Sequence, residues 1–436
     1  MSDRIQSAPG ECLPDDIWPV GKKAAFYSCF IVLGLGLFDF IDRQIMAAVL
    51  PHIKEEWMLS DTQLGMLISI VNIMLAVLVI PSAYFIDHWS RKKMIALMGG
   101  IWSLATGACA FAGGYWHMLM ARFFIGAGEA GYNPAAQALL TAQFPKKYQG
   151  TAIAITQIGM TLGIPLGLVV GAFIAQHWGW RHAFGVVAIP GMILAVMALF
   201  IRDYHSKPTA ASNEKKVRGE SYFATVKQLL KTPSLICAFL AAPLAMMYNS
   251  ALMNWLPSYL IREGGMEISA ASNVAAFILL SQVVGVGCIG PVIDFLRRYR
   301  KNAAPLALTG AFGMALVILL AAYNLMAPGS SIQIVALFIG CSFAAVTGTG
   351  TSSIIIALAD PQRRATAISL MIVSQNVFGM ALGPVFTGIL SDHFDLATAM
   401  NVMCSVIFLA MLVCLICTFT YNRDAAKVVC QDLDFN

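Results

Sequence analysis

The chain has 436 residues, of which 58% are hydrophobic and 12% are charged, and its mean hydropathy is +0.73. Because soluble domains carry about 25% charged residues, this composition excludes a soluble enzyme or nucleic-acid-binding protein and indicates a polytopic membrane protein. The net charge of +5 is small, so the positions of the basic residues matter more than their sum.

Twelve apolar stretches are long enough to cross a bilayer, since a helical span needs about 20 residues. The predicted spans are residues 24–50, 61–86, 93–112, 115–143, 149–176, 181–202, 232–262, 267–296, 303–324, 331–358, 364–391 and 396–420. The longest polar connection divides these spans six and six. The predicted organisation is a cytoplasmic tail at 1–23, a six-helix bundle at 24–202, a cytoplasmic linker at 203–231, a second six-helix bundle at 232–420 and a cytoplasmic tail at 421–436.

Basic residues are concentrated in alternate loops, as expected when Lys and Arg are retained on the cytoplasmic side. The basic loops carry Lys22, Lys23, 91–93, Lys146, Lys147, 207–231, 297–301, Arg363, Arg364, Arg423 and Lys427. The opposite loops hold little more than Lys54, Arg181 and Arg262. This asymmetry predicts that both termini are cytoplasmic, in a plasma membrane or bacterial inner membrane. The polar start of the chain contains acids as well as Arg4, so no cleavable signal peptide is expected.

The fourth predicted span carries two opposite charges at membrane depth. Arg122, Gly126, Glu129 and Asn133 are spaced i, i+4, i+7 and i+11, which places them on one stripe of a helix. Charges inside a membrane are costly, so they indicate a functional site, and a structural Arg–acid pair is the alternative. The G-x-G-x-x-G pattern at 126–131 lies within this helix, which argues against a dinucleotide-binding loop and favours close helix packing.

The first predicted span adds Asp39, Asp42 and Arg43, so all membrane-depth charges lie in the N-terminal half. Asp39 and Arg43 are i, i+4 neighbours that can pair, and Asp42 is predicted at the same depth as Arg122. Burial favours a protonated carboxyl group, whereas a nearby guanidinium favours the ionised form. Asp39, Asp42, Arg122 and Glu129 are therefore candidate proton-coupling residues.

The C-terminal half contributes only neutral polar and aromatic groups at membrane depth, and this contrast suits an amphipathic substrate. The candidate substrate-binding residues are Arg43, Arg122, Glu129, Asn133, Tyr248, Asn249 and Gln375. For the neutral residues, a helix-to-helix hydrogen bond is the alternative. The sequence shows no P-loop, nucleophile elbow or paired-histidine motif, so neither catalysis nor a metal or organic cofactor is expected.

Two matches between the halves indicate a duplicated six-helix unit. The segment 83–92 follows the second span and the segment 290–298 follows the eighth, while residues 150–153 and 365–368 open the fifth and eleventh spans in the same way. The fifth span also carries glycines at every fourth position, namely Gly159, Gly163, Gly167 and Gly171. Such a run predicts either bending at the interface between the halves or simple close packing.

The repeated loops resemble the signature loops of the major facilitator superfamily, and the resemblance extends over nearly the whole chain. It implies an all-α membrane protein with twelve transmembrane helices in two six-helix bundles related by pseudo-twofold symmetry. The positions that match the signature, with an implied role in conformational switching, are Asp87, Arg91, Lys92, Asp294 and Arg297.

Asp42-Arg43, Val49-Leu-Pro51 and the stretch 122–130 further resemble the Spinster-like branch, which is associated with lysophospholipids and sphingoid lipids or their phosphates. This resemblance implies a secondary active transporter of an amphipathic anionic lipid that works by alternating access with proton coupling. Its expected partners are membrane lipids, the amphipathic substrate and protons, and it is expected to act as a monomer. Proton-coupled transport of small organic anions such as sugar acids is the alternative, because such transporters also carry Asp-Arg in the first span.

Overall fold

The computed structural model describes residues 18–88, 90–202, 222–360 and 363–433. Within these ranges the chain forms helices joined by short turns, without a strand. Most of the predicted tail at 1–23 and of the linker at 203–231 lies outside the described residues. The described end of the linker forms a short helix, α8 (Tyr222–Leu229).

The first half of the chain forms six long helices. They are α1 (Lys22–Trp57), α2 (Asp61–His88), α3 (Arg91–Ala110), α4 (Tyr115–Gln143), α5 (Lys146–Trp178) and α6 (Trp180–Ala198). Local signals fix some of the helix ends: Met58 adopts a left-handed conformation after α1, and the Ser90 hydroxyl accepts the Lys93 N–H at the start of α3. α1 packs along α5, and α3 packs between α4 and α6.

The second half forms another six spans, two of which are interrupted. Its elements are α9 (Pro233–Arg262), α10 (Ile268–Arg297), α11 (Ala303–Asn324), α12 (Ser331–Ala344), α13 (Thr347–Leu358), α14 (Arg364–Ser374), the π-helix η1 (Gln375–Ala381), α15 (Leu382–His393) and α16 (Leu396–Leu433). The predicted span 331–358 is thus divided between α12 and α13. The predicted span 364–391 contains a π-helical turn at its centre.

The break between α12 and α13 has a polar partner on a neighbouring helix. The Ala344 carbonyl at the end of α12 accepts a hydrogen bond from the Asn249 Nδ2 of α9 at 3.2 Å and another from the Thr347 hydroxyl at 3.2 Å. A carbonyl that leaves its helical ladder inside a membrane needs such donors. The interruption is therefore stabilised by side chains that a search for apolar stretches does not weigh.

The last helix extends past the predicted boundary at residue 420. α16 continues to Leu433, and within this extension the buried carboxylate of Asp424 accepts hydrogen bonds from the Ser234 N–H at 3.1 Å and the Ser234 hydroxyl at 2.8 Å. These bonds satisfy a donor in the first turn of α9 that would otherwise have no helical partner. The start of the predicted tail is thus helical and packed against α9.

The glycine run of α5 packs this helix closely against α1. A Cβ atom on Gly163 would lie 2.7 Å from the Leu37 carbonyl oxygen, and one on Gly167 would lie 2.5 Å from the Ile41 carbonyl oxygen. α5 remains one continuous helix through Pro165. The run therefore serves close packing of α5 against α1.

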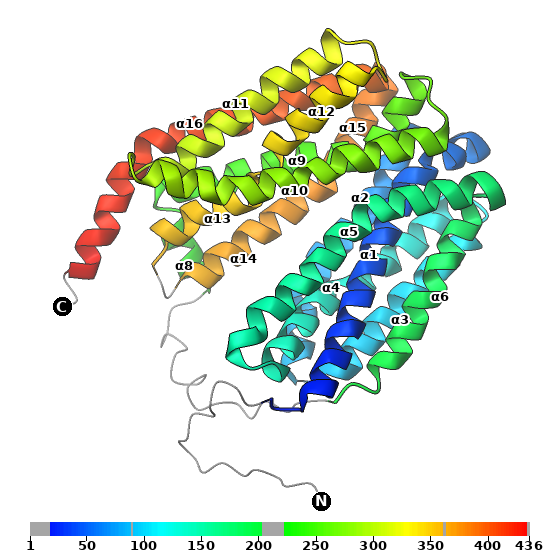
Figure 1. Ribbon diagram of the computed structural model, residues 1–436, viewed down its shortest axis with the longest axis horizontal. Coiled ribbons are helices and arrows are strands. Elements are labelled where there is room, and N and C mark those ends of the chain that lie inside the picture. The colour runs from blue at the N-terminus through cyan, green and yellow to red at the C-terminus, as the bar shows by residue number, and fades with distance from the viewer. Residues whose placement is uncertain (1–17, 89, 203–221, 361–362, 434–436) are drawn as a thin grey trace, which may run out of the picture.

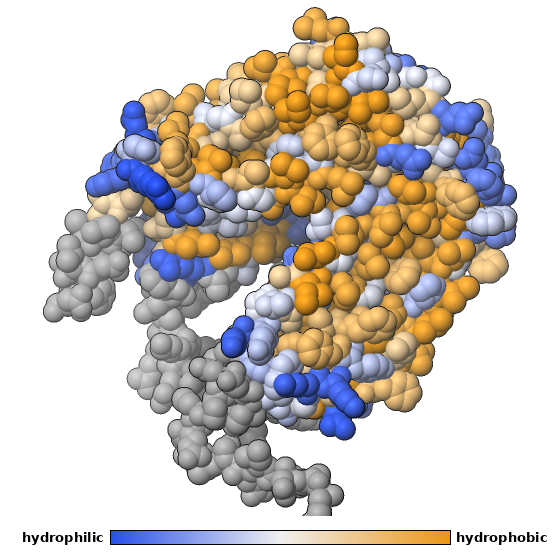
Figure 2. All heavy atoms as spheres, in the orientation of Figure 1, coloured by the Kyte–Doolittle hydropathy of each residue, from blue (hydrophilic) through white to orange (hydrophobic). Residues whose placement is uncertain are grey.

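The helices form two bundles that meet at one end and separate at the other (Figure 1). Between the bundles, α2 contacts α15 and η1, α5 contacts α10, and α1 contacts α9. We call the end where α1 stops and α2 starts the closed end, and the opposite end the open end. Figure 2 shows a hollow between the bundles at the open end, with apolar side chains covering most of the face in view and hydrophilic ones gathered toward the ends of the bundles.

Eleven of the described helical stretches are long and apolar enough to cross a membrane. The remaining long helix is α4, whose hydropathy is reduced by the charges that it carries, and which packs against α2 and α3. With α4 as the twelfth span, the predicted fold of two six-helix bundles in an all-α membrane protein is confirmed.

Candidate functional site

α1 and α4 bring the predicted membrane-depth charges into the interior of the first bundle. Asp39, Asp42 and Arg43 lie on α1, and Arg122 and Glu129 lie on α4. The three acids and Arg122 are at most 4% exposed, and the Arg43 side chain is 15% exposed. Five charges buried at this depth need partners from one another, because water and lipid supply few.

Glycines allow the neighbouring helices to approach α4 at this level. A Cβ atom on Gly126 would lie 2.4 Å from the Val71 carbonyl oxygen of α2, and one on Gly128 would lie 2.7 Å from the Trp102 nitrogen of α3. Both contacts are with backbone atoms, which cannot move aside as a flexible side chain does. The G-x-G-x-x-G stretch therefore acts as a packing surface for α2 and α3.

Arg43 is the centre of a group that we call the Arg43 cluster, consisting of Asp39, Arg43, Asn72 and Glu129. Its Nη2 pairs with Glu129 Oε2, its Nε lies 3.4 Å from Asp39 Oδ1, and its Nη1 donates to Asn72 Oδ1 at 3.2 Å. The predicted i, i+4 pair of Asp39 and Arg43 is therefore formed. Glu129 pairs with Arg43 of α1. Arg122 lies on the same face of α4 as Glu129, but the two form no ion pair in the described part of the chain.

Arg122 has donors to spare, although it is one of the most deeply buried side chains in the protein. It is 2% exposed, and its Nε and Nη2 have no hydrogen-bond partner among the described residues. Its guanidinium lies 5.7 Å from the centre of the Phe184 ring, and the nearby Asp42 attracts it electrostatically. One Asp42 oxygen accepts from Trp102 Nε1 at 3.4 Å, and the other has no hydrogen bond. A buried cation with unused donors is suited to an anionic ligand.

A small cavity between the two bundles connects Arg122 with polar groups from both sides. Its lining includes Arg43, Gln44, Asn72 and Arg122 from the first bundle and Asn254 and Met380 from the second. The cavity lies where α1, α2 and α4 face α9 and η1. It therefore combines two cations with side-chain amides and a methionine-lined wall.

The other predicted substrate-binding residues lie in different surroundings. Asn133 and Gln375 are partly exposed, and Gln375 begins η1. Tyr248 is fully buried and interacts with Tyr323, Cys341 and Cys404 inside the second bundle. Asn249 donates to the Ala245 and Ala344 carbonyls, which is the helix-to-helix hydrogen bond considered as its alternative role. These four residues are not among those that line the Arg122 cavity.

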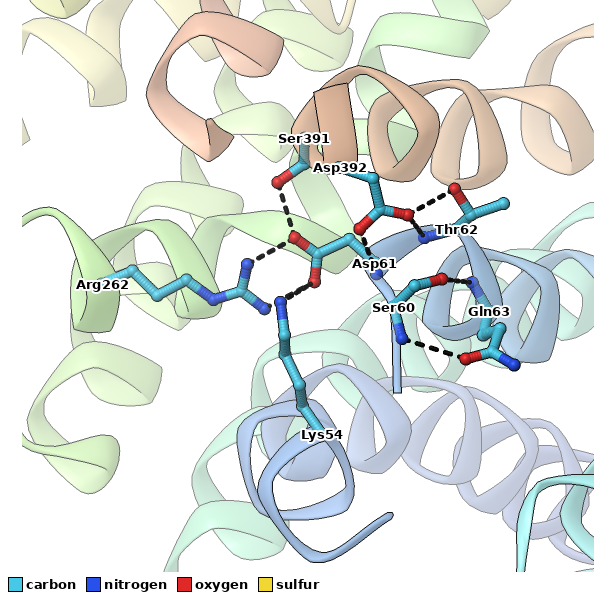
Figure 3. A network of polar contacts seen from close by, with 8 residues as sticks. All are labelled: Lys54, Ser60, Asp61, Thr62, Gln63, Arg262, Ser391 and Asp392. Atoms are coloured by element: carbon cyan, nitrogen blue, oxygen red, sulfur yellow. Dashed lines mark hydrogen bonds and ion pairs between the residues drawn. The ribbon is translucent and has the colours of Figure 1, made fainter. Parts of the chain in front are cut away.

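A second polar group, the Asp61 cluster, holds the bundles together at the closed end (Figure 3). It consists of Lys54, Asp61, Thr62, Arg262, Ser391 and Asp392. Asp61 begins α2, and its carboxylate receives Arg262 Nη1 at 2.6 Å and Nη2 at 2.9 Å, in the bidentate geometry that makes such pairs strong. The Ser391 hydroxyl donates to the same carboxylate at 2.6 Å. Arg262 and Ser391 belong to the second bundle.

Two further contacts complete the Asp61 cluster. Lys54 of α1 reaches Asp61 at 2.6 Å from within the first bundle. Asp392 of α15 accepts the N–H groups of Asp61 and Thr62 at 2.7 and 2.8 Å, so a carboxylate of one bundle caps the first turn of a helix in the other. A charge network and a helix cap therefore both cross the interface at this end.

The comparison with known proteins agrees with this architecture. The family model described as Major Facilitator Superfamily matches residues 32–384. The chain belongs to the major facilitator superfamily. This membership makes it an integral, multi-pass membrane protein and a transporter.

Within the superfamily, the relatives are spinster proteins, as the first-span and fourth-span motifs indicate. "Protein spinster homolog 1" of Xenopus tropicalis is 27% identical over 390 residues, covering 84% of this chain and 72% of that protein. "Sphingosine-1-phosphate transporter SPNS2" of the same species is 25% identical over 396 residues, covering 86% and 76%. A bacterial homologue of the human lysosomal transporter Spinster, solved in an inward-facing and unoccupied conformation, shares the fold with a TM-score of 0.81, 21% identity and coverage of 93% and 99%.

The superfamily signature loops lie at the open end. Arg91 and Lys92 begin α3, and Arg91 donates to the Ala138 carbonyl of α4 at 3.2 Å. The side chain of Asp87 lies outside the described residues. In the second copy, Asp294 and Arg297 form an ion pair of 3.3 Å on the surface of α10.

Sequence reasoning missed several residues that this superfamily member places at its interfaces. Gln44 and Asn72 line the cavity, and Asp61, Arg262 and Asp392 hold the closed end, but none was a candidate. Asn72 had a usable signal, since it is a polar residue in the middle of an apolar span. Asp61 and Asp392 lie at helix ends, where acids are common, and their partners in the opposite bundle are more than 200 residues away in the chain.

Across the described part of the chain, no group of three or more His, Cys, Asp and Glu side chains is placed to hold a metal ion. The chemistry that the site offers is ion pairing, hydrogen bonding and proton exchange.

Proposed function

We propose that this chain is a secondary active transporter that moves an amphipathic anionic lipid, of the lysophospholipid or sphingoid-phosphate class, by proton-coupled alternating access. The observation that carries the proposal is the buried Arg122 guanidinium with unused donors beside a cavity between the bundles. The printed names of the spinster relatives support a lipid substrate, because one of them is a sphingosine-1-phosphate transporter.

The charge distribution supports an orientation with both termini in the cytoplasm. At the closed end, the basic residues are paired with acids: Lys54 and Arg262 with Asp61, and Arg181 with Glu56 at 2.7 Å. The open end carries the loops rich in Lys and Arg, which are retained inside. In this orientation, in a plasma membrane or bacterial inner membrane, the hollow of Figure 2 opens to the cytoplasm.

The residues that line the small cavity offer polar groups to the headgroup and apolar surface to the chain of an amphipathic anion. Arg122 offers a planar set of donors to a phosphate or carboxylate, and Gln44 of the first bundle and Asn254 of the second add amides to the lining. Met253 and Met380 supply adaptable apolar surface on the opposite wall. Both walls belong to one chain, so a monomer is sufficient.

Proton coupling is supported by the shared use of Arg43. Two acids, Asp39 and Glu129, compete for one guanidinium, and one Glu129 oxygen is left without a hydrogen bond. A proton on Glu129 would end that competition and change the charge of the cluster. Since a bundle movement alters these contacts, proton affinity and conformation are thermodynamically linked.

The test is transport into liposomes that contain the purified chain, with and without an imposed pH gradient. Labelled lysophosphatidic acid should enter, and an excess of unlabelled small sugar acid should not compete. Arg122→Gln should abolish saturable uptake and Arg122→Lys should restore part of it, because Lys keeps the charge but not the planar fork. Arg181→Gln, a change at the ion pair with Glu56, is the matched control and should retain uptake.

Two results decide against the proposal. Competition by small sugar acids would assign the chain to the carriers of small organic anions, and the carboxylate of such a substrate would then bind Arg122. Undiminished uptake by Arg122→Gln would remove that residue from substrate binding.

A further inference from the structure

Asn72 is the one member of the Arg43 cluster that reaches across to the other bundle. It lies on α2, is 5% exposed, and accepts from Arg43 Nη1 through Oδ1 at 3.2 Å. Its Nδ2 donates to the Met380 carbonyl of η1 at 3.5 Å. The same amide therefore contacts a charged group of the first bundle and the backbone of the second.

The Met380 carbonyl is available because of the local sequence. In an α-helix this oxygen would accept the N–H of residue 384, which is a proline and has none. The chain forms the π-helical turn η1 at this point, and the Ser250 hydroxyl of α9 also donates to Met380 at 3.0 Å. An unused carbonyl inside a membrane requires such donors.

An amide side chain is suited to both tasks of Asn72. The Arg43 contact requires an acceptor, and the Met380 contact requires a donor, and a carboxamide carries both on one rigid plane. A serine is too short to span them, and an aspartate in its ionised form lacks the donor. The contacts run in series from Glu129 through Arg43 and Asn72 to the Met380 carbonyl.

We propose that Asn72 is a positioning residue that transmits the charge state of Glu129 to the interface between the bundles. The inference deepens the proposed function and depends on its alternating access. When Glu129 is ionised, it holds Arg43 in the position from which Arg43 donates to Asn72, and Asn72 then holds η1. When Glu129 takes up a proton, Arg43 loses that partner, Asn72 is released and the bundles separate more easily at this depth.

The charged groups around Arg43 all lie in the first bundle. The ionisable groups near it are Asp39, Asp42, Arg122, Glu129 and Tyr132. The facing elements α9 and η1 present Met253, Asn254 and Met380 to the cavity, and none of these ionises. The second bundle can therefore respond to the protonation state of Glu129 only through dipoles and hydrogen bonds at this level. Asn72 provides the direct hydrogen bond, to the Met380 carbonyl.

The experiment measures the conformation of the full-length chain in liposomes as a function of pH. Labels on noncanonical amino acids at Phe111 and Leu325 report the distance across the closed end, where both side chains are more than 80% exposed. In the unsubstituted chain, acidification should increase the fraction with a separated closed end. Asn72→Leu should increase that fraction roughly 2- to 10-fold at high pH, as expected for the loss of a neutral hydrogen bond across the interface, and should leave little further response to acid.

Double substitution separates transmission from simple adhesion. Glu129→Gln mimics the protonated acid, so combining it with Asn72→Leu should add little to either change alone. The matched control is Asn254→Leu in the same cavity, whose amide donates to the Ser250 carbonyl of its own helix at 2.8 Å and does not join the bundles. Its effect should be independent of pH and additive with Glu129→Gln.

Additive effects of Asn72→Leu and Glu129→Gln, or an equal shift at every pH, would show that Asn72 only holds the bundles together and would overturn the inference. An unsubstituted chain whose label distance ignores pH would overturn it as well. Failure of lysolipid uptake with an intact pH response would refute the lipid substrate of the proposed function and leave the role of Asn72 standing.

Discussion

Arg262 and Lys54 donate to the same carboxylate of Asp61 at the closed end, but they belong to different bundles. Arg262 lies in the second bundle, so its bidentate pair with Asp61 must break when the closed end separates. Lys54 lies in the first bundle with Asp61, so its contact of 2.6 Å persists during a rigid-body movement. Replacing each by Gln therefore distinguishes a contact that opposes opening from one that does not.

The size of the effect follows from the geometry. The Asp61 side chain is 3% exposed and the Arg262 side chain 24% exposed, so solvent screens their pair only partly. Hydrogen bonds to charged groups contribute about 1.5–3 kcal/mol, and Lys54 and Ser391 remain with Asp61 in Arg262→Gln, so its charge is not left unpaired. The ratio of separated to closed molecules should then rise roughly 10- to 100-fold. Lys54→Gln should change it by less than about threefold, because this partly exposed ion pair is screened by solvent and is present in both states.

The assay is again the label distance between Phe111 and Leu325, measured in liposomes at constant pH. Equal shifts in Arg262→Gln and Lys54→Gln would refute the reasoning, because both would then act through the charge of Asp61 and not through the interface. An unchanged ratio in Arg262→Gln would show that Asp392 and the helix contacts alone hold this end closed.

Three further predictions concern Gly65 of α2, the coupling acid Glu129 and the buried Asp424. Gly65→Ala should favour the separated closed end by about 1–3 kcal/mol, because the new Cβ atom would lie 2.5 Å from the Pro384 carbonyl oxygen. Gly100→Ala is the control and should leave the closed end unchanged, because a Cβ atom there meets no atom within 4 Å. Equal label distances in the two variants would contradict this prediction. Glu129→Gln should abolish accumulation driven by a pH gradient while exchange of substrate continues, and an unchanged pH dependence of uptake would exclude Glu129 from coupling. Asp424→Ala should lower the free energy of unfolding by about 1–2 kcal/mol and therefore lower the thermal unfolding midpoint. An unchanged midpoint would show that the bonds between Asp424 and Ser234 do not stabilise the junction of α9 and α16.

The sequence predicts the number, position and type of the helices well, because a bilayer imposes one strong requirement on each span. The predicted spans 115–143 and 303–324 coincide with α4 and α11. The interruptions were not predicted, since they depend on donors from other helices, such as Asn249 for the end of α12. Hydropathy does not register a carbonyl that a distant side chain satisfies.

The charged residues of the site were identifiable from the sequence, but their pairing was not. Helical spacing placed Arg122 and Glu129 on one stripe, yet Glu129 pairs with Arg43, because the rotation of α4 relative to α1 is set by glycine contacts with α2 and α3. Pro384 is a usable signal in the sequence, because a proline in a membrane span releases the carbonyl four residues earlier, and this identifies Met380 as an acceptor that needs donors from other helices.

Because Asp392 caps α2 across the interface, opening of the closed end requires polar groups to take up water. When the bundles part at the closed end, the N–H groups of Asp61 and Thr62 and the carboxylate oxygens of Asp392 lose one another and must each bind water. Water is therefore a stoichiometric participant in opening. Solutes that are excluded from protein surfaces lower the activity of water and should favour the closed end, so the osmotic strength on the two sides of the membrane would influence the resting conformation of this transporter independently of substrate and protons.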